Sequence, residues 1–217
     1  MSLFSILSHT RKFAFADNTD FHSHILPGVD DGLKTIEDAL FILSEYESLG
    51  IKEVFLTPHI MVDMPNRTDE LKARFAELQS CYDGSIRLHL SAENMLDDLF
   101  VERLQNNDVL PFGKNNDSLL VETSYFTAPM GFHDMLQQIR MHGFIPVLAH
   151  PERYDYMDKE DYSTLHDMGV QFQMNLLSPS GYYGSHVKKK ALWIDKQGWY
   201  SYIGSDIHRK TMLSELK

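Results

Sequence analysis

Cysteine is almost absent from this sequence of 217 residues, in which Cys81 is the single thiol. A disulfide framework needs paired cysteines and a cysteine-rich zinc module needs several thiolates, so both are excluded. Long apolar runs are also absent, because none approaches the roughly 20 residues of a membrane-spanning helix, and no signal peptide is found. We therefore expect a protein of the reducing cytoplasm that does not insert into a membrane.

Positive charge is also scarce, because 20 Lys and Arg side chains stand against 31 Asp and Glu, for a net charge of −11. Proteins that bind nucleic acid carry a basic surface, so a nucleic-acid partner is not expected. The acidic balance does not exclude a small anionic substrate, since bound divalent cations would make the field around them positive.

Short apolar runs alternate with helical patterns from about residue 19 onward. Near-continuous apolar strands are typical of parallel sheets that are buried on both faces. A first strand leads into His22, and further strands are expected at 51–56, 86–90, 118–121, 144–148, 170–174 and 199–203. Helices are expected at 35–50, 67–82, 95–105, 131–142, 159–168 and 185–197, with a short or missing helix at the end.

Seven strand-plus-helix units predict an α/β fold, either a closed TIM-like parallel barrel or a doubly wound open sheet. We favour the barrel because polar residues follow nearly every strand, and an open sheet would spread them too far apart. Residues 19–217 are interpreted as one domain. Residues 1–18 are interpreted as an N-terminal arm that could include residues from an expression vector.

Histidines and carboxylates stand where the expected strands end, in FHSHILPGVDDG, TPHI, SAEN, VETSY, AHPERY and GSDIH. In a parallel barrel the carboxyl ends of the strands open on one face, so these side chains would converge there. Imidazole together with carboxylate is a donor set for zinc, manganese or iron rather than for calcium. The nine candidate metal ligands are His22, His24, Asp31, His59, Glu93, Glu122, His150, Asp206 and His208.

Each of these motifs is weak by itself, since His-x-His occurs by chance and buried histidines are often satisfied core residues. His-x-His at a strand end does place two imidazoles on the same side, and Asp206 with His208 repeats that spacing. The specific signal is the whole set of motifs in this order.

In that order the motifs resemble the PHP (polymerase and histidinol phosphatase) superfamily, and more narrowly its bacterial capsule-biosynthesis tyrosine-phosphatase branch. The resemblance extends from about residue 19 to residue 208. It implies a distorted (β/α)7 TIM-like barrel with two or three divalent ions, of manganese, iron or zinc. The implied ligand sets are His22, His24, Glu93 and Asp206; Glu93, Glu122 and His150; and Asp31, His59 and His208.

The resemblance also implies a phosphoryl-binding arginine, which Arg153 in HPERY matches. The family has a further arginine downstream of Asp-x-His, and here Arg209 is near that position but out of register. Asn175 is a candidate for orienting substrate or water. Tyrosines just beyond strand ends are candidate walls of a phosphotyrosine pocket, namely Tyr125, Tyr154, Tyr182 and Tyr183.

The activity implied is that of a protein-tyrosine phosphatase, a phosphoric monoester hydrolase that uses a metal-activated hydroxide. Its substrate would be the phosphorylated tail of a capsule or exopolysaccharide tyrosine kinase, and Asp31 and the HPERY string favour this interpretation. Two alternatives remain open: a small-metabolite phosphatase of the histidinol-phosphatase type, and a non-catalytic, metal-stabilised partner of the kinase.

One further motif points to a different chemistry, because Cys81 and Arg87 fit the C-x5-R pattern of cysteine-based tyrosine phosphatases. That chemistry needs a strand, then a phosphate-binding loop, then a helix whose N-terminal amides lower the pKa of the thiol. Here the expected order is helix, turn and strand. We therefore interpret Cys81 as a half-buried residue and Arg87 as a surface residue.

Replacement of Cys81 by serine is expected to leave the turnover of a phosphotyrosyl peptide unchanged, because hydrolysis at metal ions needs no thiolate. Steady-state kinetics of both proteins at the same metal concentration test this expectation. A large loss of kcat in Cys81→Ser would favour the cysteine-based chemistry instead.

Overall fold

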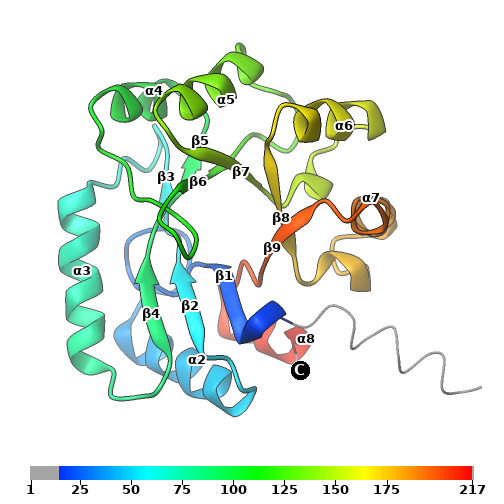
Figure 1. Cartoon of the computed structure of the whole chain (residues 1–217). Coiled ribbons are helices and arrows are strands. Elements are labelled where there is room, and N and C mark those ends of the chain that lie inside the picture. The colour runs from blue at the N-terminus through cyan, green and yellow to red at the C-terminus, as the bar shows by residue number, and fades with distance from the viewer. Residues whose placement is uncertain (1–14, 217) are drawn as a thin grey trace, which may run out of the picture.

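Parallel strands surrounded by helices make up residues 15–216, the part of the chain that the computed structural model describes (Figure 1). The strands are β1 (Thr19–Ser23), β2 (Glu53–Leu56), β3 (His59–Ile60), β4 (Arg87–Leu90), β5 (Glu93–Met95), β6 (Ser118–Glu122), β7 (Ile145–Ala149), β8 (Gln171–Asn175) and β9 (Tyr200–Gly204). The α-helices are α2 (Ile36–Ser48), α3 (Thr68–Cys81), α4 (Asp98–Gln105), α5 (Phe132–Met141), α6 (Lys159–Asp167), α7 (Ser185–Gln197) and α8 (Leu213–Leu216). Short 3-10 helices are η1 (Ala16–Asn18), η2 (Pro151–Arg153), η3 (Ser178–Ser180) and η4 (Lys210–Met212).

Three helices, α2, α4 and α6, begin where the sequence supplies a capping side chain. Thr35 precedes α2 and accepts a hydrogen bond from the backbone N–H of Asp38. Asp97 caps α4 in the same way, and Asp158 forms a capping box with Asp161 at the start of α6. These side chains satisfy amide groups that have no partner inside the helix, which fixes where each helix can start.

The strands pair in two parallel ladders, β1-β2-β4 and β3-β5-β6-β7-β8-β9. The ladders are continuous along the chain, because only residues 57–58 separate β2 from β3 and only residues 91–92 separate β4 from β5. At the other edge, β1 meets the end of β9: the N–H of Asp206 donates to the carbonyl of His22 (2.7 Å), and the N–H of His24 donates to that of Ile207 (3.1 Å).

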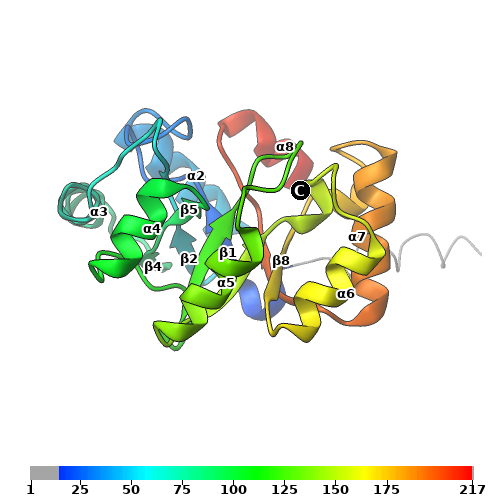
Figure 2. The same cartoon turned by 90° about the horizontal axis from the view of Figure 1, so that it is seen from above.

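Helices surround these strands when the molecule is seen from above (Figure 2). The interior between the strands holds an apolar cluster that includes Phe21 and Phe55 from the first ladder and Leu120 and Val147 from the second. Side chains of both ladders therefore share one interior. Within residues 15–216, no helix combines the length and the apolar character that a membrane span requires.

The strands and helices expected from the sequence are confirmed, with ends displaced by a few residues and a short α8 at the end. The α/β class with parallel strands is confirmed as well, whereas a closed TIM-like barrel stays a prediction because the described strands form no closed ladder. Residues 1–14 of the expected N-terminal arm lie outside the described residues. Cys81 is exposed rather than half-buried, because it is the last residue of α3 and faces solvent.

The contact between β1 and β9 is built around one buried carboxylate, that of Asp20. Its Oδ1 accepts from the backbone N–H of Ser205 (2.8 Å) and of His22 (3.2 Å). Its Oδ2 accepts from the Ser205 hydroxyl (2.6 Å) and the Tyr46 hydroxyl (3.0 Å). Burial raises the pKa of Asp20 to about 6, against the lowering effect of these donors. Asp20 thus ties together two segments, those that carry His22 and Asp206.

Replacement of Tyr46 by phenylalanine is expected to destabilise the protein, because it removes a buried donor to this carboxylate without changing the packed ring. A hydrogen bond to a charged group contributes about 1.5–3 kcal/mol. The free energy of unfolding, measured by urea denaturation, should therefore fall by about this amount. Tyr82→Phe is the matched control, since the hydroxyl of Tyr82 bonds to Glu47 in a more exposed place. Equal losses in the two variants would contradict this role of Asp20.

Candidate metal centre

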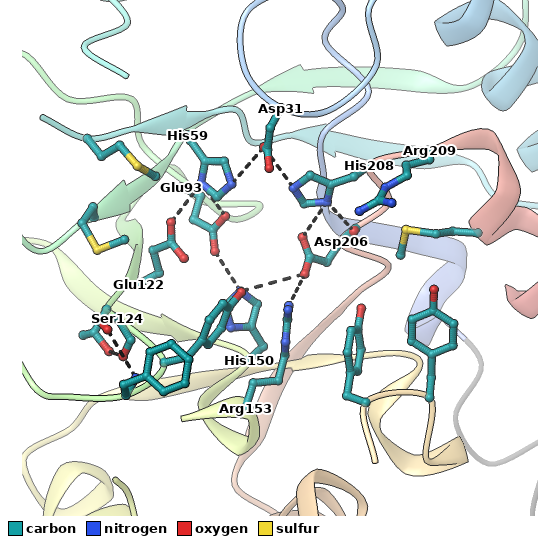
Figure 3. A pocket seen from close by; sticks show the side chains of 18 of the residues that line it. Asp31, His59, Glu93, Glu122, Ser124, His150, Arg153, Asp206, His208 and Arg209 are labelled. Atoms are coloured by element: carbon teal, nitrogen blue, oxygen red, sulfur yellow. Dashed lines mark hydrogen bonds and ion pairs between the residues drawn. The ribbon is translucent and has the colours of Figure 1, made fainter. Parts of the chain in front are cut away.

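All nine predicted ligands lie at the carboxyl ends of the strands, although they come from distant parts of the sequence. Figure 3 shows seven of them around one pocket, namely Asp31, His59, Glu93, Glu122, His150, Asp206 and His208. His22 lies in β1 and His24 directly after it, and both are fully buried beneath this pocket. The convergence that the strand pattern predicts is present.

The most deeply buried group consists of His22, His24, Glu93 and Asp206, and it has the membership expected for the first ligand set. One donor atom from each residue lies within 4.8 Å of the others. His22 Nε2 is 3.1 Å from Glu93 Oε2, and His24 Nε2 is 3.3 Å from both Glu93 Oε2 and Asp206 Oδ1. Two nitrogens and two oxygens therefore point at one small volume, as the ligands of a divalent ion do.

A second group forms around Glu93 and Glu122, with a different histidine from the one expected. His59 Nδ1 lies 3.2 Å from Glu93 Oε2 and 2.9 Å from Glu122 Oε1. His150 is also adjacent, since its Nε2 lies 3.0 Å from Glu93 Oε1. Both histidines thus contact Glu93, and the compact donor group with Glu122 contains His59 rather than His150.

The third group is the one nearest to solvent and consists of His24, Asp31, His59 and His208. Asp31 Oδ1 lies 3.5 Å from His59 Nε2 and 3.4 Å from His208 Nε2. The side chain of Asp31 is 64% exposed. The three residues of the expected third ligand set therefore lie together. His24 joins them, and the group faces the pocket.

Two site residues that the sequence analysis missed hold the histidines in place. Asp30 Oδ2 lies 2.8 Å from His24 Nδ1 and accepts from the N–H of His59 at 3.2 Å. Gln173 Oε1 lies 2.8 Å from His22 Nδ1. Such contacts fix the ring and the tautomer of a ligating histidine. Gln173 could have been found by strand parity, because it stands two residues before Asn175 on β8 and faces the same side.

The backbone is also shaped for the site. His150 and Asp206 adopt positive φ angles of 32° and 53°, which are uncommon for residues other than glycine. Gly204 permits a close approach of β9 to β1, because a Cβ there would lie 2.3 Å from the Cβ of His22. The two strand ends are thus brought together at some conformational cost.

The charges in the centre compensate one another. Burial lowers the pKa of His22, but the neighbouring Glu93 and Asp206 carboxylates outweigh it and raise that pKa to about 9. Burial and the charge of Glu93 raise the pKa of Glu122 to about 7. Burial and the charge of Arg153 lower the pKa of His150 to about 4. Protons on histidines therefore balance the buried carboxylates, and a divalent ion would replace such protons on binding.

Buried polar atoms without a hydrogen-bond partner are concentrated at this centre. Among residues 15–216 they include His59 Nδ1, Glu93 Oε2, Glu122 Oε1 and His150 Nδ1. His59 Nδ1 lies 3.2 Å from Glu93 Oε2 and 2.9 Å from Glu122 Oε1, but no directed hydrogen bond joins these atoms. Imidazole nitrogens and carboxylate oxygens left in this state are suitable ligands for manganese, iron or zinc, so the donor set fits a metal centre.

A pocket of about 510 Å³ lies over the centre. Arg153 and Arg209 line it, together with Tyr125, Tyr182 and Phe126, a residue that is 73% exposed. The Nη1 of Arg153 donates to Asp206 Oδ2 at 2.6 Å (Figure 3). Anionic groups could therefore meet both arginines directly above the donor cluster.

Two of the candidate substrate contacts are placed elsewhere. Tyr154 is completely buried below the pocket wall, where its hydroxyl accepts from the N–H of Thr123, so its placement among wall residues was wrong. Asn175 is also completely buried and donates to Asp206 Oδ2 (3.1 Å) and to the Tyr183 hydroxyl (3.1 Å). Asn175 therefore supports site residues from behind, whereas Tyr125 does line the pocket.

Replacement of Gly204 by alanine is expected to weaken metal binding, because the new Cβ would displace His22 from the centre. Disturbing the support of a metal ligand typically costs about 10- to 100-fold in affinity, and we expect a loss of that order. Calorimetric titration of metal-depleted protein with Mn²⁺ measures it. Ser201→Ala, at an exposed position on the same strand, is the control. Unchanged affinity in a folded Gly204→Ala protein would contradict the expectation.

Comparison with known proteins identifies a family whose model matches most of this chain. Residues 18–214 match the model of the family described as capsular polysaccharide synthesis, CpsB/CapC. CpsB of Streptococcus agalactiae, a tyrosine-protein phosphatase, is 28% identical over 208 residues, which cover 87% of this chain and 82% of that protein. CapC of Staphylococcus aureus, a putative tyrosine-protein phosphatase, is 26% identical over 208 residues, which cover 91% of this chain and 81% of that protein.

Solved structures show the same fold. A structure from a study of YwqE of Bacillus subtilis and CpsB of Streptococcus pneumoniae, described as unique metal-dependent tyrosine phosphatases, superposes with a TM-score of 0.79. It is 24% identical, and the match covers 90% of this chain and 81% of that chain. The lactonase Lmo2620 of Listeria monocytogenes is more distant, with a TM-score of 0.55, 13% identity, and coverage of 94% of this chain and 81% of that chain.

Proposed function

Because the chain belongs to the capsular polysaccharide synthesis family CpsB/CapC, we propose that it is a metal-dependent tyrosine-protein phosphatase. The observation that supports this most strongly is the cluster of nine histidine and carboxylate side chains beneath a pocket that also contains Arg153. The names of relatives from Staphylococcus, Streptococcus and Bacillus agree with this activity.

Two or three divalent ions are the proposed cofactors, of manganese, iron or zinc. His22, His24, Glu93 and Asp206 would hold one ion, and His24, Asp31, His59 and His208 would surround another. Glu93 and Glu122, with His59 and His150 beside them, would hold the third. When bound, the ions supply Lewis acidity, which lowers the pKa of water and polarises a phosphoryl group.

Arg153 is the proposed phosphoryl-binding residue. Its guanidinium lines the pocket beside Asp206, and its planar set of N–H donors matches phosphoryl oxygens in geometry and charge. Arg209 lines the same pocket next to His208 and stays a second candidate for this role. Donors fixed at this place would stabilise the charge that develops on the equatorial oxygens during in-line displacement.

The mouth of the pocket suits an aromatic substituent. Phe126 and Tyr182 line it, and these two residues are 73% and 48% exposed. A phenyl ring that enters toward the arginines would pack against these faces. Phosphotyrosine in the tail of a capsule or exopolysaccharide tyrosine kinase is accordingly the proposed substrate. A small-metabolite phosphatase of the histidinol-phosphatase type is the second candidate, since it would use the same donor cluster.

The proposal extends to the architecture and location of the protein. We interpret residues 19–217 as one metallophosphatase domain with the plan of a distorted (β/α)7 barrel. The interior that both ladders share, and the contact of β1 with the end of β9, support that plan. We also propose that the protein acts in the cytoplasm, where a kinase tail would be accessible.

Removal of divalent metal is expected to abolish phosphatase activity, because the proposed nucleophile is a hydroxide formed at the bound ions. A chelator-treated, metal-depleted preparation is assayed on a phosphotyrosyl peptide before and after addition of Mn²⁺, Fe²⁺ or Zn²⁺. Full activity without metal would contradict the proposal.

The substrate class is tested by assaying histidinol phosphate in parallel under the same metal conditions. A higher kcat/KM for the phosphotyrosyl peptide supports the tyrosine phosphatase. A preference for histidinol phosphate favours the second candidate, and tight kinase binding without release of phosphate would indicate a non-catalytic partner.

A further inference from the structure

Arg153 is held between two aromatic rings at the wall of the pocket. Its Cζ lies 4.6 Å from the ring centroid of Tyr125 and 4.3 Å from that of Tyr183. Both distances are well inside the range of a cation–π contact, which extends to about 6 Å. The side chain of Arg153 is only 17% exposed, so water competes weakly for these contacts.

Both rings are themselves fixed by the fold. The hydroxyl of Tyr183 accepts a hydrogen bond from Nδ2 of the buried Asn175 at 3.1 Å. Asn175 is held in turn, because its Oδ1 accepts from the N–H of Leu177 at 3.0 Å. On the other side, the ring of Tyr125 lies 6.0 Å from that of the buried Tyr154, and its carbonyl accepts from the N–H of Asp155 at 2.7 Å.

This arrangement determines which surface of Arg153 remains available. Two aromatic rings lie within 4.6 Å of its Cζ and restrict where a ligand can approach the guanidinium. One of its nitrogens, Nη1, bonds to Asp206 Oδ2 at 2.6 Å. The other N–H groups lie in the same plane, and bidentate binding of phosphoryl oxygens uses groups in this plane. A free arginine loses rotamer entropy when it is ordered, and here the ordering precedes the arrival of substrate.

We propose that Tyr125 and Tyr183 are positioning residues that orient Arg153 for the phosphoryl group, a role that rests on the proposed phosphatase function. They act through the guanidinium, and Asn175 supports Tyr183 from behind. This differs from a wall that contacts the phenyl ring of a substrate. A wall residue would affect the binding of aryl phosphates only, whereas a residue that positions Arg153 affects inorganic phosphate as well.

The experiment compares Tyr183→Leu and Tyr125→Leu with Tyr183→Phe and Tyr125→Phe in the metal-loaded protein. A cation–π contact contributes about 0.5–2 kcal/mol. The leucine variants are therefore expected to raise the Ki of inorganic phosphate, and to lower kcat/KM for a phosphotyrosyl peptide, by about 2- to 30-fold. Tyr125→Phe keeps the aromatic face and should stay within about twofold of the wild type. Tyr183→Phe keeps the face but loses the bond to Asn175, so its loss should be smaller than that of Tyr183→Leu.

A double-mutant cycle with Arg153→Met separates positioning from a general structural effect. If the tyrosines act through Arg153, then Tyr183→Leu should cause no further loss of phosphate binding once the guanidinium is absent. Phe41→Leu is the matched control, because this exposed ring also contacts a cation, Lys210 at 5.6 Å, and lies outside the pocket lining. It should leave both constants unchanged.

Three outcomes would overturn the proposal. One is an unchanged phosphate Ki in both leucine variants, and another is an equal loss in the phenylalanine and leucine variants. The third is an additive loss in the Arg153→Met background. Failure of the proposed function would look different, since the wild-type protein itself would then release no phosphate with any metal.

Discussion

Compensation of the buried charge of Glu93 is the interaction on which the rest of the structure depends. Its Oε2 lies within 3.3 Å of nitrogens of His22, His24 and His59, and its Oε1 lies 3.0 Å from His150. Neighbouring positive charge, chiefly that of His22, outweighs burial and holds the pKa of Glu93 well below its usual range. A carboxylate this deep needs compensation by hydrogen-bond donors or by positive charge, and around Glu93 that charge would come from protonated imidazole or from a metal ion.

This constraint explains why the strand ends are built as they are. The histidines around Glu93 must approach it closely, and supporting residues hold them there, such as Asp30 behind His24 and Gln173 behind His22. The positive φ angles at His150 and Asp206 also belong to the arrangement that places these side chains close to Glu93. Strain and buried polar groups, which are costly elsewhere in a fold, are concentrated where the chemistry requires fixed side chains.

Much of the fold could be predicted because it follows from local patterns. Helix α7 has the predicted bounds, since an amphipathic segment ends at a glycine that can adopt a positive φ. The strand ends at Leu56 and Leu90 were predicted, but the short strands β3 and β5 that follow them were not, because the mainly polar residues after each end show no apolar strand pattern. Whether a strand stays in one ladder depends on the register of its neighbours, and a period of apolar residues carries no information on that register.

The sequence by itself determined which donor atoms the site contains, because imidazoles and carboxylates at strand ends are a property of the order of residues along the chain. Only the tertiary structure decided how they pair: His59 joins Glu93 and Glu122, Tyr154 lies in the core, and Arg153 lies between two tyrosine rings. The physical reason is distance. Tyr125 and Tyr183 are far apart in the chain, and only the packing of the loops that follow β6 and β8 brings them to the same guanidinium.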